Sequence, residues 1–192
     1  MFEYFTDRAR KAMHFANSEC LGFNSPMVNS EHLLLGLLKE GSGYAHNILI
    51  ELGVEYGNTK KYILKGIKVV ENNIVMGNLP ASPLVKKIIG LSIERARSLN
   101  NNYVGTEHLL YGLIDVGEGM GYDILFDYYK LTLKDIIGKL DQVSGHNSDS
   151  PNIPQDTKYQ NTLLAIKKAI NTEGCNKDII SNIKKLLTSI GI

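Results

Sequence analysis

Two matching clusters of polar residues hold the side chains of this 192-residue chain that are best suited to chemistry. They read Ser-Glu-His at 30–32 and Thr-Glu-His at 106–108. Glu31 and Glu107 each fall in the first turn of a predicted helix, where the helix dipole favours a carboxylate by about 0.3–1 kcal/mol. The same dipole favours the ionised form, which accepts a bidentate pair of hydrogen bonds from a guanidinium group. The two glutamates could therefore stabilise helix ends or bind a cationic side chain.

None of the motifs examined for catalysis, nucleotide binding or metal binding is complete in the sequence. G-x-x-x-x-G ends at Gly41 and at Gly117, but Ser42 and Glu118 follow where a phosphate-binding loop needs lysine. The order Glu-His at 31–32 and 107–108 is not the H-E-x-x-H of a zinc protease, and no second histidine follows four residues later. The sequence predicts a protein that is not an enzyme and needs no metal or cofactor. A small-ligand binder or an enzyme that uses the two Glu-His pairs is the alternative.

Composition narrows the class of partner and the compartment. Lys and Arg number 21 against 20 Asp and Glu, and without a basic run the chain lacks the charge pattern of a nucleic-acid-binding protein. The two cysteines, Cys20 and Cys175, lie far apart, which favours a reducing compartment over a disulfide framework. Charges at positions 3, 7 and 8 argue against a signal peptide, and no long apolar run is present. We expect a cytoplasmic protein with neither nucleic acid nor membrane as partner.

An internal repeat organises the elements that carry the two clusters. Residues 30–49 and 106–125, which are 76 positions apart, are identical at ten of twenty positions, and the match continues upstream. Repeat 1 is predicted at about 5–70 and repeat 2 at about 81–141, and together they form one domain over 1–142. Apolar residues recur with helical spacing and nowhere alternate as in a strand, so the predicted class is all-α, with four helices in each repeat.

Capping residues mark where these helices should begin. Thr6 precedes the first helix of repeat 1, and Ser82 followed by Pro83 precedes its counterpart in repeat 2. Ser30 and Thr106 are expected to begin the second helices with their own hydroxyls as caps, and these helices should stop at the glycines at 41 and 117. Shorter helices are predicted through 48–52, 58–70, 121–129 and 132–140. The leucines at 33–35, 37–38 and 109–110 should form the core.

The last part of the chain is predicted to be separate. Residues 143–157 are rich in Ser, Asn, Asp and Pro, which is typical of a linker. Residues 158–192 carry two amphipathic helical patterns and should form a helical hairpin. Because two helices cannot bury both of their apolar faces alone, this hairpin should dock on the repeats or on another protein.

Three motifs give the chain a family resemblance over about residues 1–141. FTDRARKAMHFA at 5–16, S/T-E-H-L-L-x-G-L at 30–37 and 106–113, and N-Y-V-G-T-E-H at 102–108 resemble the duplicated Clp N-terminal domain, especially that of ClpC-type unfoldases. The resemblance implies a pseudo-twofold domain of eight helices. It also implies a docking platform for protein substrates or adaptors of an AAA+ chaperone–protease.

The resemblance further implies which residues bind. In ClpC-type members the Glu of T-E-H receives the guanidinium of phosphoarginine on tagged substrates, and the matching positions are Glu31 and Glu107, with Ser30 and Thr106 beside them. Family members also have an apolar and basic ligand surface near the chain start, matched here by Phe2 and Arg10.

Departures from the family pattern alter these expectations. The first motif is preceded by NSPMVN where the family usually has GHNYIG, and Leu84 replaces the arginine of T-P-R-A-K in repeat 2. Since Arg8 and Arg10 lie in repeat 1, we expect weakened phosphoarginine recognition that is stronger at Glu31. No Walker A motif is present, and the helical pair at 158–190 does not resemble the start of an ATPase module, which favours a free-standing adaptor. The N-terminal fragment of a full-length Clp ATPase is the alternative.

Overall fold

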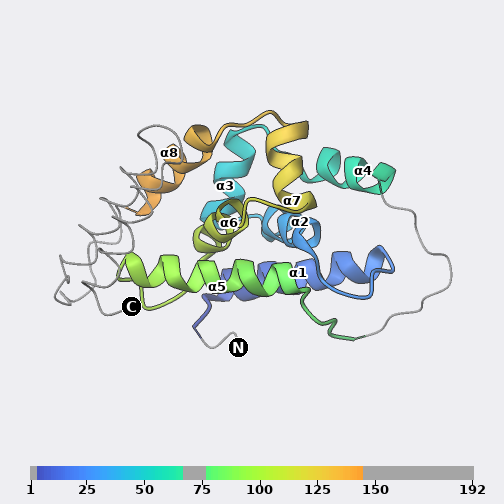
Figure 1. The fold of residues 1–192 in the computed structure, drawn as a ribbon, viewed down its shortest axis with the longest axis horizontal. Coiled ribbons are helices and arrows are strands. Elements are labelled where there is room, and N and C mark those ends of the chain that lie inside the picture. The colour runs from blue at the N-terminus through green and yellow to red at the C-terminus, as the bar shows by residue number, and fades with distance from the viewer. Residues whose placement is uncertain (1–3, 67–76, 145–192) are drawn as a thin grey trace, which may run out of the picture. The chain divides into compact units, whose positions relative to one another are not determined.

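The computed structural model describes residues 4–66 and 77–144, and in these ranges it is helical (Figure 1). Its elements are α1 (Asp7–Gly22), α2 (Ser30–Glu40), α3 (Tyr44–Glu51), α4 (Tyr56–Gly66), α5 (Pro83–Ser98), α6 (Thr106–Asp115), α7 (Met120–Asp123), the π-helical η1 (Ile124–Tyr128) and α8 (Leu133–Ser144). The all-α class and the tandem arrangement are confirmed. α8 continues through Ser144, two residues into the segment predicted as a linker. The rest of that linker, the hairpin at 158–192 and residues 67–70 lie outside the described residues.

The first helix of each repeat begins at its predicted cap. Thr6 Oγ1 accepts a hydrogen bond from the Ala9 N–H, and Ser82 Oγ accepts one from the Val85 N–H, both at 3.2 Å. Each hydroxyl satisfies a backbone donor that has no partner within its helix. The two caps therefore fix the starts of α1 and α5 at equivalent points of the two repeats.

A glycine in each central helix allows close packing against the first helix of its repeat. A Cβ added at Gly36 of α2 would lie 2.3 Å from the Ala12 carbonyl oxygen of α1. A Cβ added at Gly112 of α6 would lie 2.4 Å from the Ile88 carbonyl oxygen of α5.

The predicted core is confirmed, since these leucines are all nearly inaccessible to solvent: Leu33, Leu34, Leu35, Leu37, Leu38, Leu109 and Leu110.

The residues before the first helix of each repeat form backbone hydrogen bonds with the other repeat. The Thr6 N–H donates to the Val104 carbonyl at 3.0 Å, so the start of α1 lies beside the start of α6. Symmetrically, the Ser82 N–H donates to the Val28 carbonyl at 2.9 Å, which brings the start of α5 to the start of α2. α3 also packs against α6, and α7 packs against α2. The repeats are therefore interlocked rather than two bundles that merely adjoin.

The prediction that Ser30 and Thr106 cap their own helices is wrong. Ser30 Oγ accepts a hydrogen bond from the Gly121 N–H of α7 at 3.1 Å, and Thr106 Oγ1 accepts one from the Ala45 N–H of α3 at 3.3 Å. Each hydroxyl residue is already the first helical residue, and Asn29 or Gly105 occupies the N-cap position. The interlocking brings the orphan donors of the other repeat's short helix to these hydroxyls, which therefore cap across the repeats.

Candidate functional site

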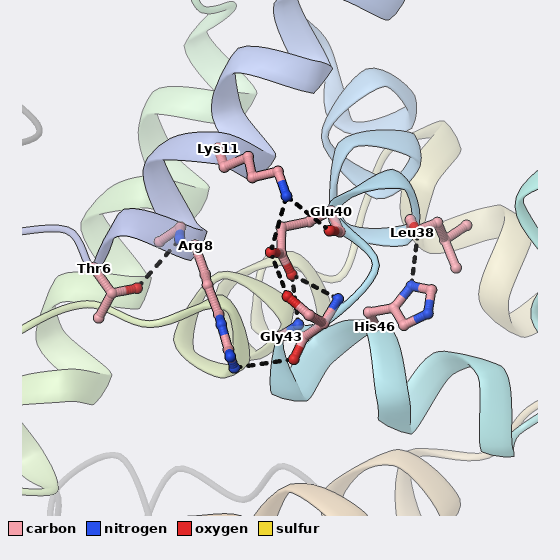
Figure 2. A network of polar contacts seen from close by, with 9 residues as sticks. Thr6, Arg8, Lys11, Leu38, Glu40, Gly43 and His46 are labelled. Carbon is pink, nitrogen blue, oxygen red and sulfur yellow. Dashed lines mark hydrogen bonds and ion pairs between the residues drawn. The ribbon is translucent and has the colours of Figure 1, made fainter.

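The Thr106 site gathers side chains from both repeats at the starts of three helices. It consists of Arg8 of α1, Ser42 and Gly43 before α3, and Thr106 and Glu107 of α6. Arg8 Nη1 donates to the Ser42 carbonyl at 3.0 Å, as Figure 2 shows beside Gly43. A Cβ added at Gly43 would lie 2.5 Å from Thr106 Oγ1, so only glycine allows this approach. The turn at Ser42 and Gly43 thus contacts both Arg8 of repeat 1 and Thr106, the residue before Glu107, of repeat 2.

The Ser30 site is the pseudo-symmetric counterpart. It consists of Leu84 of α5, Glu118 and Gly119 before α7, and Ser30 and Glu31 of α2. A Cβ added at Gly119 would lie 2.5 Å from Leu84 Cδ2 and 2.8 Å from Ser30 Oγ. A shallow cavity of about 370 Å³ opens at this place. The position that Arg8 fills in the first site is occupied here by an apolar side chain.

This geometry corrects the expected grouping of Arg8 and Arg10 with Glu31. Arg8 contacts the loop at Thr106, and Arg10 donates to the Phe5 carbonyl, next to Thr6, which pairs with Val104 of repeat 2. Residues of one repeat do not share a site here, because the start of each repeat's first helix lies beside the other repeat. The leucine that replaces the family's arginine therefore affects the Ser30 site.

Both glutamate side chains are largely buried, although each lies in the first turn of its helix. The Glu31 side chain is 9% exposed and the Glu107 side chain 12%, and neither has a Lys or Arg partner in the described part of the chain. Burial raises the pKa of each carboxyl above its ordinary value, although nearby backbone and hydroxyl donors oppose this shift. Desolvation therefore acts against the helix dipole at both carboxyls. A bound cation would lower both pKa values and so favour the ionised form.

The adjacent histidines serve the fold. His32 Nδ1 accepts a hydrogen bond from the Asn29 N–H and His108 Nδ1 accepts one from the Gly105 N–H, both at 2.9 Å. Each histidine fills the capping-box position that Glu or Gln often occupies. Burial lowers both pKa values to about 4, so the rings are neutral at pH 7. Because Nδ1 already serves the backbone, neither ring is free to act as a general base at that nitrogen, which argues against an enzyme built on the Glu-His pairs.

A buried acid that sequence reasoning missed holds the loop of the Thr106 site. Glu40 accepts hydrogen bonds from the Ser42 N–H at 3.1 Å, the Ser42 hydroxyl at 2.9 Å and the Gly43 N–H at 2.5 Å, and Lys11 Nζ lies 3.9 Å from it (Figure 2). Burial alone would raise the pKa of Glu40, but these donors outweigh it and lower the pKa. An acid directly before Gly-Ser-Gly was the available signal. Val116 stands at the equivalent position in repeat 2.

The remaining predicted site residues divide between the described and undescribed parts. Phe2 lies outside the described residues. Arg10 forms an ion pair with Asp7 and lines a groove that is separate from both glutamate sites. No group of three metal-ligating side chains occurs within residues 4–66 and 77–144. The helices in those ranges include none that is long and apolar enough to cross a bilayer.

Known proteins share this sequence and this architecture. A family model described as "Clp repeat (R) N-terminal domain" matches residues 4–128 and 85–169. A relative from Guillardia theta, the ATP-dependent Clp protease ATP-binding subunit ClpA homolog, is 39% identical over 125 residues, which are 65% of this chain and 15% of that protein. The chloroplastic chaperone protein ClpC2 of Oryza sativa subsp. japonica is 38% identical over 65% of this chain and 14% of its own length.

Solved structures agree on the fold. The N-terminal domain of the chaperone ClpD from Arabidopsis thaliana has a TM-score of 0.61 to this chain at 19% sequence identity, and the match covers 74% of this chain and 96% of that one. At that identity the likeness concerns architecture. The chain therefore spans only a small part of its curated relatives' length and nearly all of a separately solved domain.

Proposed function

The chain belongs to the Clp N-terminal domain family, and on this premise we propose that it is a non-catalytic module that binds proteins handled by a Clp-type AAA+ unfoldase. Its partners would be substrates of the associated protease or adaptors that deliver them. The same role serves a free-standing adaptor or the N-terminal part of a larger ATPase. A cytoplasmic location is part of this proposal, although one relative is named as chloroplastic.

The finer proposal is that arginine-phosphorylated proteins are among the ligands. The observation that carries it is the Thr106 site, where the buried carboxylate of Glu107 has no Lys or Arg partner among the described residues and Arg8 reaches the adjoining loop. A carboxylate and a guanidinium on neighbouring helix starts complement a ligand that carries a guanidinium and a phosphoryl group. The Ser30 site offers Glu31 for the guanidinium, but Leu84 cannot pair with a phosphoryl group. We therefore expect stronger recognition at Glu107, the reverse of the sequence-based expectation.

Calorimetric titration of free phosphoarginine into the wild type and single variants tests this proposal. Glu107→Gln should weaken binding roughly ten- to hundredfold, because hydrogen bonds to charged groups are lost. Glu31→Gln should change affinity much less. Arg8→Leu, which copies Leu84, should resemble Glu107→Gln, and Leu84→Arg should strengthen the Ser30 site.

Two results would contradict the proposal. An absence of heat with the wild type would restrict the protein to unmodified partners. Equal heats from the wild type, Glu31→Gln and Glu107→Gln would remove both glutamates from binding. Thermal melts of each variant control for folding, and a loss of no more than about 1 kcal/mol is expected if the glutamates contribute to the fold only through the helix dipole.

A further inference from the structure

The two glutamate sites differ in the charges that surround the buried carboxylate. At the Thr106 site, Arg8 donates to the turn before α3, and Lys11 Nζ lies 3.9 Å from the Glu40 carboxylate (Figure 2). The charges of Arg8 and Lys11 balance those of Glu40 and Glu107 when both acids are ionised. This site therefore has both a carboxylate and a guanidinium to offer, with no net charge from these four groups.

The Ser30 site lacks one of these cations. Lys87 Nζ donates to Glu118 Oε1 at 3.2 Å, so the charges of this pair cancel. Leu84 stands where the other site has its arginine. The charge of Glu31 is therefore not balanced by these groups, and the site is anionic when Glu31 is ionised. A ligand with a single positive charge complements it.

The cavity of the Ser30 site suits the apolar stem of an arginine side chain. Pro83 and Leu84 line it together with Gly119, and its volume is about 370 Å³. A long cationic side chain can lay its methylene groups on such a surface while its charged end reaches a polar partner. Glu31 directly follows Ser30 at this cavity, its side chain is 9% exposed, and it has no Lys or Arg partner in the described ranges.

A phosphoryl group on that arginine would gain little at the Ser30 site. Leu84 has no donor to offer it, and Lys87 is already paired with Glu118. The Glu118 carboxylate, which also lines the cavity, has the same sign of charge as a phosphoryl group. An anion that loses water without gaining partners costs free energy. The site therefore discriminates against the modification by repulsion as well as by a missing attraction.

We propose that the Ser30 site binds the unmodified arginine side chain of a partner protein, whereas the Thr106 site takes the phosphorylated form. The inference rests on the proposed function in one respect, namely that the buried glutamates receive guanidinium groups. Arginine is favoured over lysine because its planar guanidinium donates two parallel hydrogen bonds to one carboxylate. The chain would then recognise two states of the same residue at two pseudo-symmetric sites.

Nuclear magnetic resonance titration of the full chain separates the sites, because each has a glycine whose backbone N–H reports on it. N-acetyl-arginine amide should shift the resonance of Gly119 and leave that of Gly43 nearly unchanged. The same compound phosphorylated on its guanidinium should do the opposite. Nα-acetyl-lysine amide is the control for charge alone, and it should shift Gly119 only at much higher concentration.

Substitutions assign the binding to named side chains. Glu31→Gln should weaken binding of N-acetyl-arginine amide at Gly119 by roughly ten- to hundredfold, because a charge-assisted bidentate pair loses one of its charges. Glu107→Gln is the matched control and should leave this binding unchanged. Leu84→Arg should abolish it and confer binding of the phosphorylated amide, whereas Leu84→Met should keep the wild-type preference. The other resonances of each variant control for folding.

Three results would overturn the inference. They are the absence of a shift at Gly119 with N-acetyl-arginine amide, equal shifts at Gly119 and Gly43, and undiminished binding in Glu31→Gln. The response of Gly43 to the phosphorylated amide tests phosphoarginine recognition separately. If Gly43 does not respond while Gly119 responds to arginine, phosphoarginine recognition fails and the inference stands, and in the reverse case the inference alone fails.

Discussion

The two repeats share an apolar skeleton and differ in the charged cluster on the first helix. In repeat 1, Glu19 is 2% exposed and accepts hydrogen bonds from Lys39 at 2.6 Å, Lys60 at 2.7 Å and the Tyr56 hydroxyl at 2.8 Å. In repeat 2, Arg95 stands at the equivalent position, so the sign of the charge is reversed. The core leucines and close-packing glycines, by contrast, recur in both.

The partners of Arg95 complete this reversal. Its guanidinium carbon lies 4.1 Å from the centroid of the Tyr111 ring, and Nη2 lies 3.7 Å from an Asp141 oxygen. Its side chain is 31% exposed, whereas Glu19 is enclosed. The comparison teaches that the duplicated fold constrains packing volume tightly, whereas a polar cluster can change sign if its partners change with it.

The largest losses of stability are expected from substitutions in the apolar core, which the two repeats share. Leu34→Ala and Leu110→Ala each delete a fully buried side chain at equivalent positions, and each should lower the free energy of unfolding by about 2–5 kcal/mol. Urea denaturation of both variants measures this. Because the repeats are interlocked, each variant should still unfold in a single transition. Two separate transitions would show that the repeats unfold independently. Free energies of unfolding close to that of the wild type would contradict the predicted helical register.

Acidification tests a second shared feature, the buried histidines. Their pKa is about 4 in the folded protein and about 6.5 in an unfolded chain, so the unfolded state binds more protons between these values. Stability should therefore fall as the pH drops from 6.5 to 4, by up to about 3 kcal/mol for each histidine. Glu31 and Glu107 act in the opposite direction. Their raised pKa values contribute stability at low pH that is lost as the pH rises through those values, so part of the loss is offset.

Glutamine variants separate these contributions. His32→Gln and His108→Gln keep an acceptor for the N-cap N–H, since Gln is a normal capping-box residue, but they cannot titrate. Thermal melts between pH 7 and pH 4 should show a weaker pH dependence for each variant and the weakest for the pair. An unchanged pH dependence in the double variant would mean that other groups control acid stability.

The reversed charge clusters should respond unequally. Glu19→Gln leaves two lysine side chains without their buried carboxylate and should cost about 1.5–3 kcal/mol, the range for hydrogen bonds to charged groups. Arg95→Gln removes a partly exposed pair and should cost about 1 kcal/mol or less. Burial alone would raise the pKa of Glu19, but its three donors outweigh it and lower the pKa. Equal losses in the two variants would contradict the view that burial sets the difference.

Local sequence signals predict much of the fold, but they do not predict which residues come together in each site. The Thr6 and Ser82 caps and the leucine runs are signals that lie within a few turns of chain, and the structure confirms them. The repeat at an offset of 76 residues is visible by comparing the chain with itself. The exchange of helix starts between the repeats depends on long-range packing, to which no local pattern refers. For that reason the sequence alone does not predict that Arg8 and Thr106 belong to one site. The acid Glu40 was missed because its role depends on a turn that only the structure reveals.

The last difference between the repeats concerns one missing hydrogen-bond partner. His108 Nε2 lies 2.9 Å from the Asn101 side-chain amide, whereas the Nε2 of His32 has no hydrogen-bond partner within the described residues. Since Nδ1 of each ring accepts from the backbone, Nε2 carries the proton, and the Asn101 amide, whose Nδ2 is placed at this distance, accepts that proton when its oxygen and nitrogen are exchanged. Ser25 occupies the position equivalent to Asn101, and its shorter side chain bonds to the Met27 carbonyl instead.

Exchanging these two residues tests the explanation. Ser25→Asn should supply the acceptor and stabilise the protein by about 0.5–1.5 kcal/mol, the net value of a typical buried hydrogen bond. Asn101→Ser should copy repeat 1 in repeat 2 and destabilise by a similar or larger amount, because it leaves a buried donor unsatisfied. Chemical denaturation at pH 7, where both rings are neutral, measures the two changes, and His32→Gln combined with Ser25→Asn shows whether they are coupled. If Ser25→Asn stabilises equally with and without His32, the gain does not come from the imidazole, and the difference between the repeats at this position has another cause.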